Sequence, residues 1–362
     1  MSLASESRNE ISCQSYSRRI LFPLSIGLLL VAYLIYQDVT THGVDFNTAL
    51  RQLQWQGRTW FWLVLAVVMV VLRDLAYMVQ LRILTDGHLR WRSIIEVILL
   101  WDFFAAISPS MMGGAAVAIY MLIKERLTVG RSTAIVFTTV LLDEIFYLTM
   151  LPLGLWLVGK EAVFAGLADM RSDFISAGLM TIFWLAYGGI LIYVLFLGAS
   201  LFVWPNVMNR VLRILFMFRI FKRWRRWGLR TARDLLITSV ELRDKPSLFW
   251  MKIWGVTAVA WLARYMVLNC ILAAFSPGSM GVYEHALALA RQAALFVIMV
   301  ISPTPGSSGV AEAGFTLMFS DMAPLGLVLP LALFWRAISY YPYLFIGVPV
   351  MSRWVKRVYR AE

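Results

Sequence analysis

Long apolar runs constrain this chain more than any other feature of its sequence. A helix needs roughly 20 predominantly apolar residues to cross the hydrocarbon core of a bilayer. Several runs approach or exceed that length and carry Trp or Tyr near their ends, as membrane–water interfaces favour. They are residues 20–36, 60–79, 133–158, 176–204, 250–275 and 324–350. We therefore predict an all-α, polytopic membrane protein with about six full spans.

Composition supports this class and argues against a soluble globule. Of the 362 residues, 60% are hydrophobic and 15% are Asp, Glu, Lys or Arg, whereas soluble domains have about 25% charged residues. The net charge of +12 comes from residues between the apolar runs, so it indicates topology and anionic lipid rather than nucleic acid. Neither the two cysteines, Cys13 and Cys270, nor the three histidines have metal-ligand spacing. We expect no metal and no cofactor.

Two further apolar regions are interrupted by proline, glycine and serine. Residues 94–107 are followed by a break at 108–114, and residues 287–302 by a break at 303–309. Proline removes a backbone donor and glycine lowers helix propensity. Each region is therefore either one broken span or a hairpin that enters and leaves on one side of the membrane.

The distribution of Lys and Arg favours hairpins. With two hairpins, the predicted cytoplasmic segments hold 24 of the 33 basic residues and the outer segments hold four. With two full spans, the eleven basic residues of 205–249 move outside, against the positive-inside rule. The hairpin topology places residues 1–19 and 351–362 in the cytoplasm as tails, around one transmembrane domain at 20–350.

The two interrupted regions also resemble each other. Ile107–Pro109 recurs as Ile301–Pro303, and each lies between two spans, within halves at about 55–160 and 245–350. In the predicted topology the hairpins enter from opposite faces, as in the inverted repeats of many transporters. Non-helical backbone at membrane depth must be buried in protein or line a water-filled cavity. We therefore expect both breaks to line one cavity.

Charged side chains inside the apolar runs are candidate functional residues, because each costs on the order of 2.5–3.5 kcal/mol at a helix centre. One interpretation is that Arg264 or Arg336 binds an anionic headgroup, while Asp143, Glu144 or Glu312 carries a proton or balances charge. The alternative is that all of them form structural ion pairs.

Other features allow both a functional and a structural interpretation. The breaks free backbone N–H groups for an anion, or simply form tight turns. Arg73 and Asp74 are interpreted as a structural ion pair rather than as functional residues, because both can reach towards the inner surface. The basic, amphipathic linker 205–249 is expected to bind the anionic membrane surface through residues 210–233, or to anchor topology. The break residues that are candidates for substrate binding are Ser108, Gly113, Gly114, Pro303, Pro305, Gly306 and Gly309.

The run from Pro303 to Glu312 resembles the P-x-P-G-G-x-G-x-x-E signature of the flippase-like membrane family, which includes the transmembrane region of lysylphosphatidylglycerol synthase and UPF0104-type proteins. The similarity extends over about residues 20–350, with Ser307 in place of a glycine. It implies a bacterial inner-membrane protein that translocates lipids. No aminoacyl-transferase domain accompanies the run here, so the reaction of the synthase is not implied.

Three functions are consistent with these patterns. The first is a flippase or transporter that binds a phospholipid or other anionic lipid at the cavity, without ATP, since no nucleotide-binding loop is present. The second is a non-transporting subunit or regulator of cell-envelope lipid synthesis, and the third is a DedA-like transporter. We expect no enzyme activity, because no nucleophile–base set is recognisable.

Overall fold

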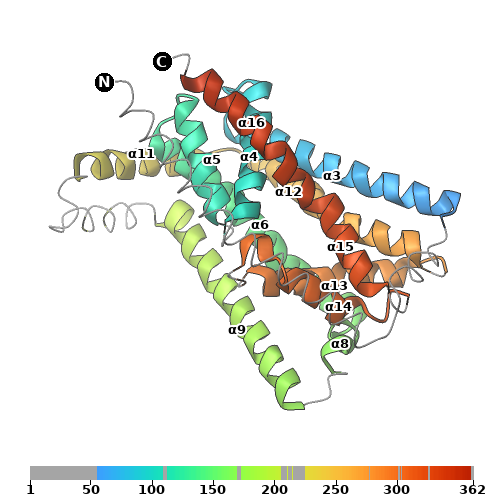
Figure 1. Cartoon of the computed structure of the whole chain (residues 1–362). Helices are drawn as coiled ribbons and strands as arrows, with labels where there is room; N and C mark the ends of the chain where they lie inside the picture. The colour runs from blue at the N-terminus through green and yellow to red at the C-terminus, as the bar shows by residue number, and fades with distance from the viewer. Residues whose placement is uncertain are drawn as a thin grey trace, which may run out of the picture.

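The computed structural model of the chain is a bundle of helices (Figure 1). It describes residues 55–108, 112–168, 173–204, 210, 214, 225–276, 278–300, 302, 304–324 and 327–359. Every regular element in these residues is a helix, which confirms the predicted all-α membrane class. The predicted span 20–36 and tail 1–19 lie outside the described residues.

Within the described residues, six helical stretches are long and apolar enough to cross a bilayer. They are Gly57–Leu84, Val129–Val158, Ala177–Val203, Ser247–Phe275, Val282–Val300 and Val328–Val358. The set differs from the predicted one at two places. A 19-residue helix covers most of the apolar run predicted as a hairpin arm at 287–302, and the span predicted at 324–350 consists of two helices.

The first half of the bundle contains the helices α3 (Gly57–Leu84), α4 (Trp91–Ile107), α5 (Met112–Lys124) and α6 (Val129–Val158). Local chemistry explains the ends of α6. The Thr128 hydroxyl caps its N-terminus by accepting a hydrogen bond from the Arg131 N–H at 3.2 Å. Gly159 ends it with a φ of 87°, which glycine adopts without strain.

The second half contains α12 (Ser247–Phe275), α13 (Val282–Val300), α14 (Val310–Phe319), α15 (Val328–Ser339) and α16 (Tyr341–Tyr359). Its first helix, α12, packs along α3 in the opposite direction. Arg58, near the start of α3, donates to carbonyl groups at the end of α12, including that of Ser276 at 2.9 Å. Gln80 and Thr257 form a buried hydrogen bond of 2.8 Å further along the pair. The antiparallel pairing is what an inverted repeat requires.

Helices α4 and α5 fold back on each other, as do α13 and α14, and we call these pairs hairpin 1 (residues 91–124) and hairpin 2 (residues 282–319). Each packs against the last helix of the other half, because α4 contacts α16 and α13 contacts α6 (Figure 1). This exchange holds the halves together. Entry of the hairpins into the bilayer from opposite faces stays a prediction.

Ion pairs fasten the base of each hairpin. At hairpin 1, Arg357 of α16 lies 2.6 Å from the Glu96 carboxylate and also binds Glu125. At hairpin 2, Arg291 binds Asp321 beyond α14 and donates to the carbonyl oxygen of Ala162 at 2.8 Å. The hairpin bases are therefore fixed to the opposite half.

Four helices complete the described part of the bundle: α7 (Lys160–Val163), α8 (Ala165–Ala168), α9 (Asp173–Gly198), which continues as the π-helix η1 (Ala199–Val203), and α11 (Arg225–Arg243). Helix α9 projects away from the bundle with a largely exposed apolar surface, which suits contact with lipid (Figure 1). The linker predicted to be amphipathic falls outside the described residues up to 224, except for 210 and 214. Its later part is α11, which packs on α6.

The contact between α6 and α13 predicts a test of the fold. A Cβ atom on Gly154 would lie 2.7 Å from the Ala290 Cβ, whereas one on Gly188 of α9 would meet nothing within 4 Å. We expect Gly154→Leu to lower the melting temperature in detergent, because overpacking costs about 1–3 kcal/mol. Gly188→Leu is the matched control and should melt like the parent. Equal melting of both variants would contradict the close α6–α13 approach.

Candidate functional site

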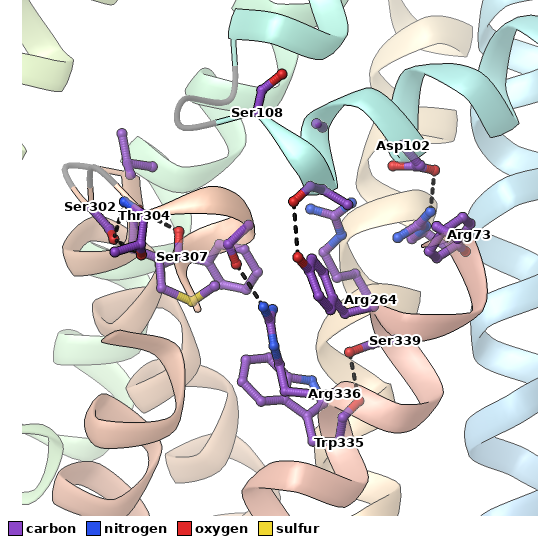
Figure 2. Close-up of a pocket in the computed structure, with 18 residues that line it drawn as sticks. Arg73, Asp102, Ser108, Arg264, Ser302, Thr304, Ser307, Trp335, Arg336 and Ser339 are labelled. Carbon is purple, nitrogen blue, oxygen red and sulfur yellow. Dashed lines mark hydrogen bonds and ion pairs between the residues drawn. The ribbon is translucent and has the colours of Figure 1, made fainter. Parts of the chain in front are cut away.

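One cavity lies where the two helix breaks meet the charged residues of α3, α12 and α15 (Figure 2). Its volume is about 130 Å³. A buried water needs roughly 10–15 Å³ of such space, so the cavity has room for several waters or a small polar headgroup. The charged residues in its wall are Arg73, Asp102, Arg264 and Arg336, and the serines from the breaks are Ser108, Ser302 and Ser307.

The first break places Ser108 in the cavity wall. Helix α4 ends at Ile107, and Ser108 turns into extended backbone with a ψ of 144°. Gly113 and Gly114 lie at the packing contact between α4 and α5 and are not among the residues that line the cavity. A Cβ on Gly113 would lie 2.0 Å from the Ser108 Oγ, and one on Gly114 would lie 2.7 Å from the Trp101 carbonyl oxygen. These glycines therefore allow α5 to approach α4 closely.

The second break is a strained turn, and the carboxylate of Glu312 binds its backbone. Gly306, Ser307 and Gly309 have φ values of 55°, 56° and 84°, the left-handed region that favours glycine. The Ser307 hydroxyl stabilises the turn by donating to the Met299 carbonyl oxygen at 2.8 Å. The Gly309 N–H donates to the Glu312 carboxylate at 2.6 Å. The N-terminus of α14, predicted to receive a substrate anion, is therefore occupied by a carboxylate of the chain.

Of the two prolines predicted at this break, Pro305 belongs to the described residues and is not among those that line the cavity. Pro305 is buried and begins the short 3-10 turn η3 (Pro305–Ser307). Pro303 lies outside the described residues.

Tyr340 connects both breaks. It separates α15 from α16, and its hydroxyl donates to the Ala106 carbonyl oxygen in the last turn of α4 at 2.9 Å. Its ring packs against Gly306, where an added Cβ would lie 2.2 Å from a ring carbon. The Arg336 guanidinium lies 3.8 Å from the ring centroid. One side chain therefore contacts hairpin 1, the second break and a cavity arginine.

Arg336 is paired within the protein. Its Nε lies 3.1 Å from a Glu312 carboxylate oxygen, and both side chains are at most 5% exposed. Its Nη2 donates to the Gly306 carbonyl oxygen at 2.7 Å. This arginine holds the second break in place, and Glu312 balances its charge.

Arg73 is also paired, and the expectation that it reaches the inner surface is wrong. It is 5% exposed and lies 2.5 Å from the Asp102 carboxylate and 2.7 Å from that of Asp74. The guanidinium lies 4.7 Å from the Tyr343 ring centroid, and the Tyr343 hydroxyl donates to Asp74 at 2.9 Å. Four side chains from α3, α4 and α16 thus form one polar network beside the cavity.

Arg264 differs from the other two arginines of the cavity wall. It is half-buried, and its guanidinium stacks on Trp261, 4.5 Å from the ring centroid, with Phe296 at 5.9 Å. It forms no ion pair or hydrogen bond with the described part of the chain. Arg73 and Arg336 each have a carboxylate partner. Arg264 therefore supplies a cation to the cavity that a ligand can reach.

Asp143 and Glu144 lie on α6, behind the cavity wall. The Asp143 carboxylate accepts hydrogen bonds from Trp261 Nε1 at 2.7 Å and from the Tyr77 hydroxyl at 3.2 Å. One carboxylate oxygen of Glu144 is buried without a hydrogen-bond partner among the described residues. Trp261 contacts both Asp143 and Arg264, so a single indole links the Asp143 carboxyl group to a residue of the cavity wall.

The structure thus brings some of the residues predicted from the sequence to the cavity and places others elsewhere. It brings Ser108, Gly306, Arg264 and Arg336 to one cavity. Asp102 was missed, although a carboxylate in the middle of the apolar run 94–107 was a usable signal. Tyr340 and Tyr343 were missed because an aromatic residue is ordinary in an apolar helix. Within the described ranges, no group of three His, Cys, Asp or Glu side chains is arranged to hold a metal.

The helices and the charged cavity define a multi-pass membrane protein. The chain belongs to the family described as "Lysylphosphatidylglycerol synthase TM region", whose model matches residues 20–347. It is similar to a "UPF0104 membrane protein" of Archaeoglobus fulgidus, with 24% identity over 327 residues that cover 86% of this chain and 93% of the relative. No solved structure matches it.

The Arg336–Glu312 pair predicts a change in stability. Glu312→Gln keeps the shape of the side chain but leaves Arg336 buried without its carboxylate. Breaking a buried pair in this way costs about 3–5 kcal/mol, so the variant should melt at a lower temperature in detergent. The double variant Glu312→Gln/Arg336→Met removes the stranded charge and should melt above the single variant. Glu161→Gln, at an exposed position on α7, is the control. Parent-like melting of Glu312→Gln would contradict the pairing.

Proposed function

We propose that the protein is a flippase or transporter that moves an anionic lipid headgroup through the cavity between the two breaks. The observation that carries the proposal is Arg264, a cavity cation without a carboxylate partner among the described residues. An unpaired charge inside a membrane protein is costly and is usually functional. Guanidinium groups also bind phosphate through charge-assisted, bidentate hydrogen bonds.

The surroundings of Arg264 suit a phosphate-bearing headgroup. Ser108, Ser302 and Ser307 bring hydroxyl groups to the same cavity, and hydroxyls donate to phosphate oxygens. Apolar side chains such as Phe296 and Met299 complete the wall and suit the part of a lipid next to its acyl chains. The family takes its printed name from a phospholipid synthase, which supports a phospholipid as the substrate class. The proposal assigns the protein no catalytic step.

The fold supports movement without ATP. Hairpins exchanged between two halves, with broken helices at a shared site, form the architecture in which transporters rock one repeat against the other. In this proposal the tips of hairpins 1 and 2 alternate in opening the cavity to one leaflet and then the other. We place the protein in a bacterial inner membrane with both termini cytoplasmic, and the basic linker 205–249 on the anionic inner surface.

A non-transporting membrane subunit is the second candidate. The fully paired Arg73 and Arg336 favour it, because structural ion pairs need no ligand. A purely structural role does not explain why Arg264 lies at a cavity without an ion-pair partner among the described residues. A transport assay therefore separates the two candidates.

The proposed sidedness predicts a labelling pattern. Asp244, after α11, and Glu161, on α7, are both exposed and belong to segments predicted on opposite sides. We expect a membrane-impermeant maleimide to label Glu161→Cys on intact cells, and Asp244→Cys only after permeabilisation, in a Cys13→Ser/Cys270→Ser background. The reverse pattern would put the basic linker outside and remove the basis for the hairpin topology.

The transport proposal predicts a loss of lipid movement when the cavity cation is removed. Purified protein in liposomes should expose acyl-labelled phosphatidylglycerol of the inner leaflet to a membrane-impermeant quencher. Arg264→Gln should slow this movement by about 10-fold or more, because a hydrogen bond to a charged group contributes about 1.5–3 kcal/mol.

Arg243→Gln is the control for that assay, since Arg243 is half exposed on the surface of α11 and is not among the residues that line the cavity. Equal rates with and without protein for phosphatidylglycerol, phosphatidylethanolamine and phosphatidylserine would overturn the transport proposal. Transport by the parent that Arg264→Gln leaves unchanged would overturn the role of Arg264.

A further inference from the structure

Asp143 stands out among the carboxyl groups inside the bundle. It lies midway along α6, next to Glu144, and apolar residues flank this pair of carboxyl groups on both sides. The carboxylates of Asp102, Glu312 and Asp321 each form an ion pair with an arginine. Asp143 forms no ion pair with the described residues, and its hydrogen bonds come from the neutral donors Trp261 and Tyr77. An isolated charge at this depth is expensive, so a proton on the carboxyl group is a favourable alternative.

The groups around Asp143 act on it in opposite directions. The positive charge of Arg264 on α12 favours the ionised carboxylate, whereas the negative charges of Asp102 on α4 and Glu144 on α6 disfavour it. Arg73 of α3 is paired with Asp102, and α13 presents the apolar ring of Phe296 to this region. The titratable groups facing the two α6 carboxyls are Tyr77, Asp102, Tyr147, Tyr193, Arg264 and Tyr265.

Trp261 connects this carboxyl group to the cavity. Its indole N–H donates to Asp143, and the face of the same ring carries the Arg264 guanidinium. An anion that binds Arg264 offsets the positive charge that keeps Asp143 ionised. The carboxylate then takes a proton from water. Binding of the anion and of the proton therefore favour each other by equal factors.

We infer that Asp143 is a proton-binding site and that each anionic headgroup bound at Arg264 brings one proton onto it. The inference rests on the proposed transport function, and it names the proton as the ion coupled to transport. One negative headgroup and one proton together carry no net charge. Their joint movement costs no electrical work, whereas the movement of a lone charge must be driven against or by the membrane potential.

The sign of the pH dependence follows from this linkage. A proton taken up on binding makes the anion bind more tightly as the pH falls, by up to about 10-fold per pH unit while one full proton is taken up. Tyr77→Phe removes a donor that stabilises the ionised form. It should therefore move the pH-dependent range towards higher pH, which a purely structural role of Tyr77 would not do.

The test uses the full-length protein in detergent with dioctanoyl phosphatidylglycerol as the probe. The dissociation constant is measured from pH 5 to 8, and proton uptake is recorded in weak buffer with a pH-sensitive dye. For the parent we expect up to one proton per lipid bound and tighter binding at low pH. Asp143→Asn should bind the lipid with no proton uptake and no pH dependence. Glu144→Gln, an adjacent isosteric control, should keep both.

The outcomes separate the two proposals. Binding by the parent with no proton uptake and a constant affinity would overturn the proton site and leave the transport proposal standing. Loss of uptake in Glu144→Gln but not in Asp143→Asn would overturn the assignment to Asp143. Absence of lipid binding by the parent would overturn both. If Asp143→Asn does not fold, the parent's proton count and the shift in Tyr77→Phe decide the question.

Discussion

The structure depends on one constraint: charged groups and bare backbone inside a membrane bundle need partners. Arg73 with Asp102, Arg336 with Glu312, and Arg291 with Asp321 meet it by ion pairs that join helices from different parts of the chain. The same pairs fix the breaks and the hairpin bases, because their partners lie on those segments. Once these pairs have formed, Arg264 keeps its charge at the cavity, stacked on aromatic rings and without an ion pair to the described residues. The need to pair buried charges thus explains both how the fold is held together and why the unpaired Arg264 points to the cavity as the candidate site.

Much of the fold was predictable. The length of the apolar runs indicates membrane-spanning helices, and the distribution of basic residues indicates their topology. The two breaks were predictable for the same kind of reason, since Pro and Gly act locally on the backbone. The predictions failed where a residue's role depends on a distant partner. Arg73 was expected to extend to the surface because Asp102, 29 residues away, was not considered. Gly113 and Gly114 pack α5 on α4, and no local signal separates that role from ligand binding.

The two halves share an architecture but differ in chemistry. Where the last helices of the second half, α15 and α16, face the breaks, Arg336, Tyr340 and Ser339 leave a polar cavity. On the α6 side, a cluster of stacked rings fills the space, formed by Phe146, Tyr147, Trp261, Tyr265 and Phe296. Asp143 sits beside that cluster. The polar cavity and the carboxyl group of Asp143 therefore lie in different surroundings, and Trp261 contacts both Asp143 and the cavity residue Arg264.

The hairpins are held very differently at their two ends. Ion pairs fasten the base of hairpin 1 to α16, and the base of hairpin 2 is held by the Arg291–Asp321 pair and by a hydrogen bond from Arg291 to Ala162 of the opposite half. At the other end, the Tyr340 hydroxyl donates one hydrogen bond to the end of α4 and its ring touches Gly306, while Arg336 holds the second break. A neutral hydrogen bond contributes only about 1 kcal/mol net. The contact between Tyr340 and α4 is therefore weaker than the charged contacts at the hairpin bases, and a movement that opens the cavity would meet the least resistance there.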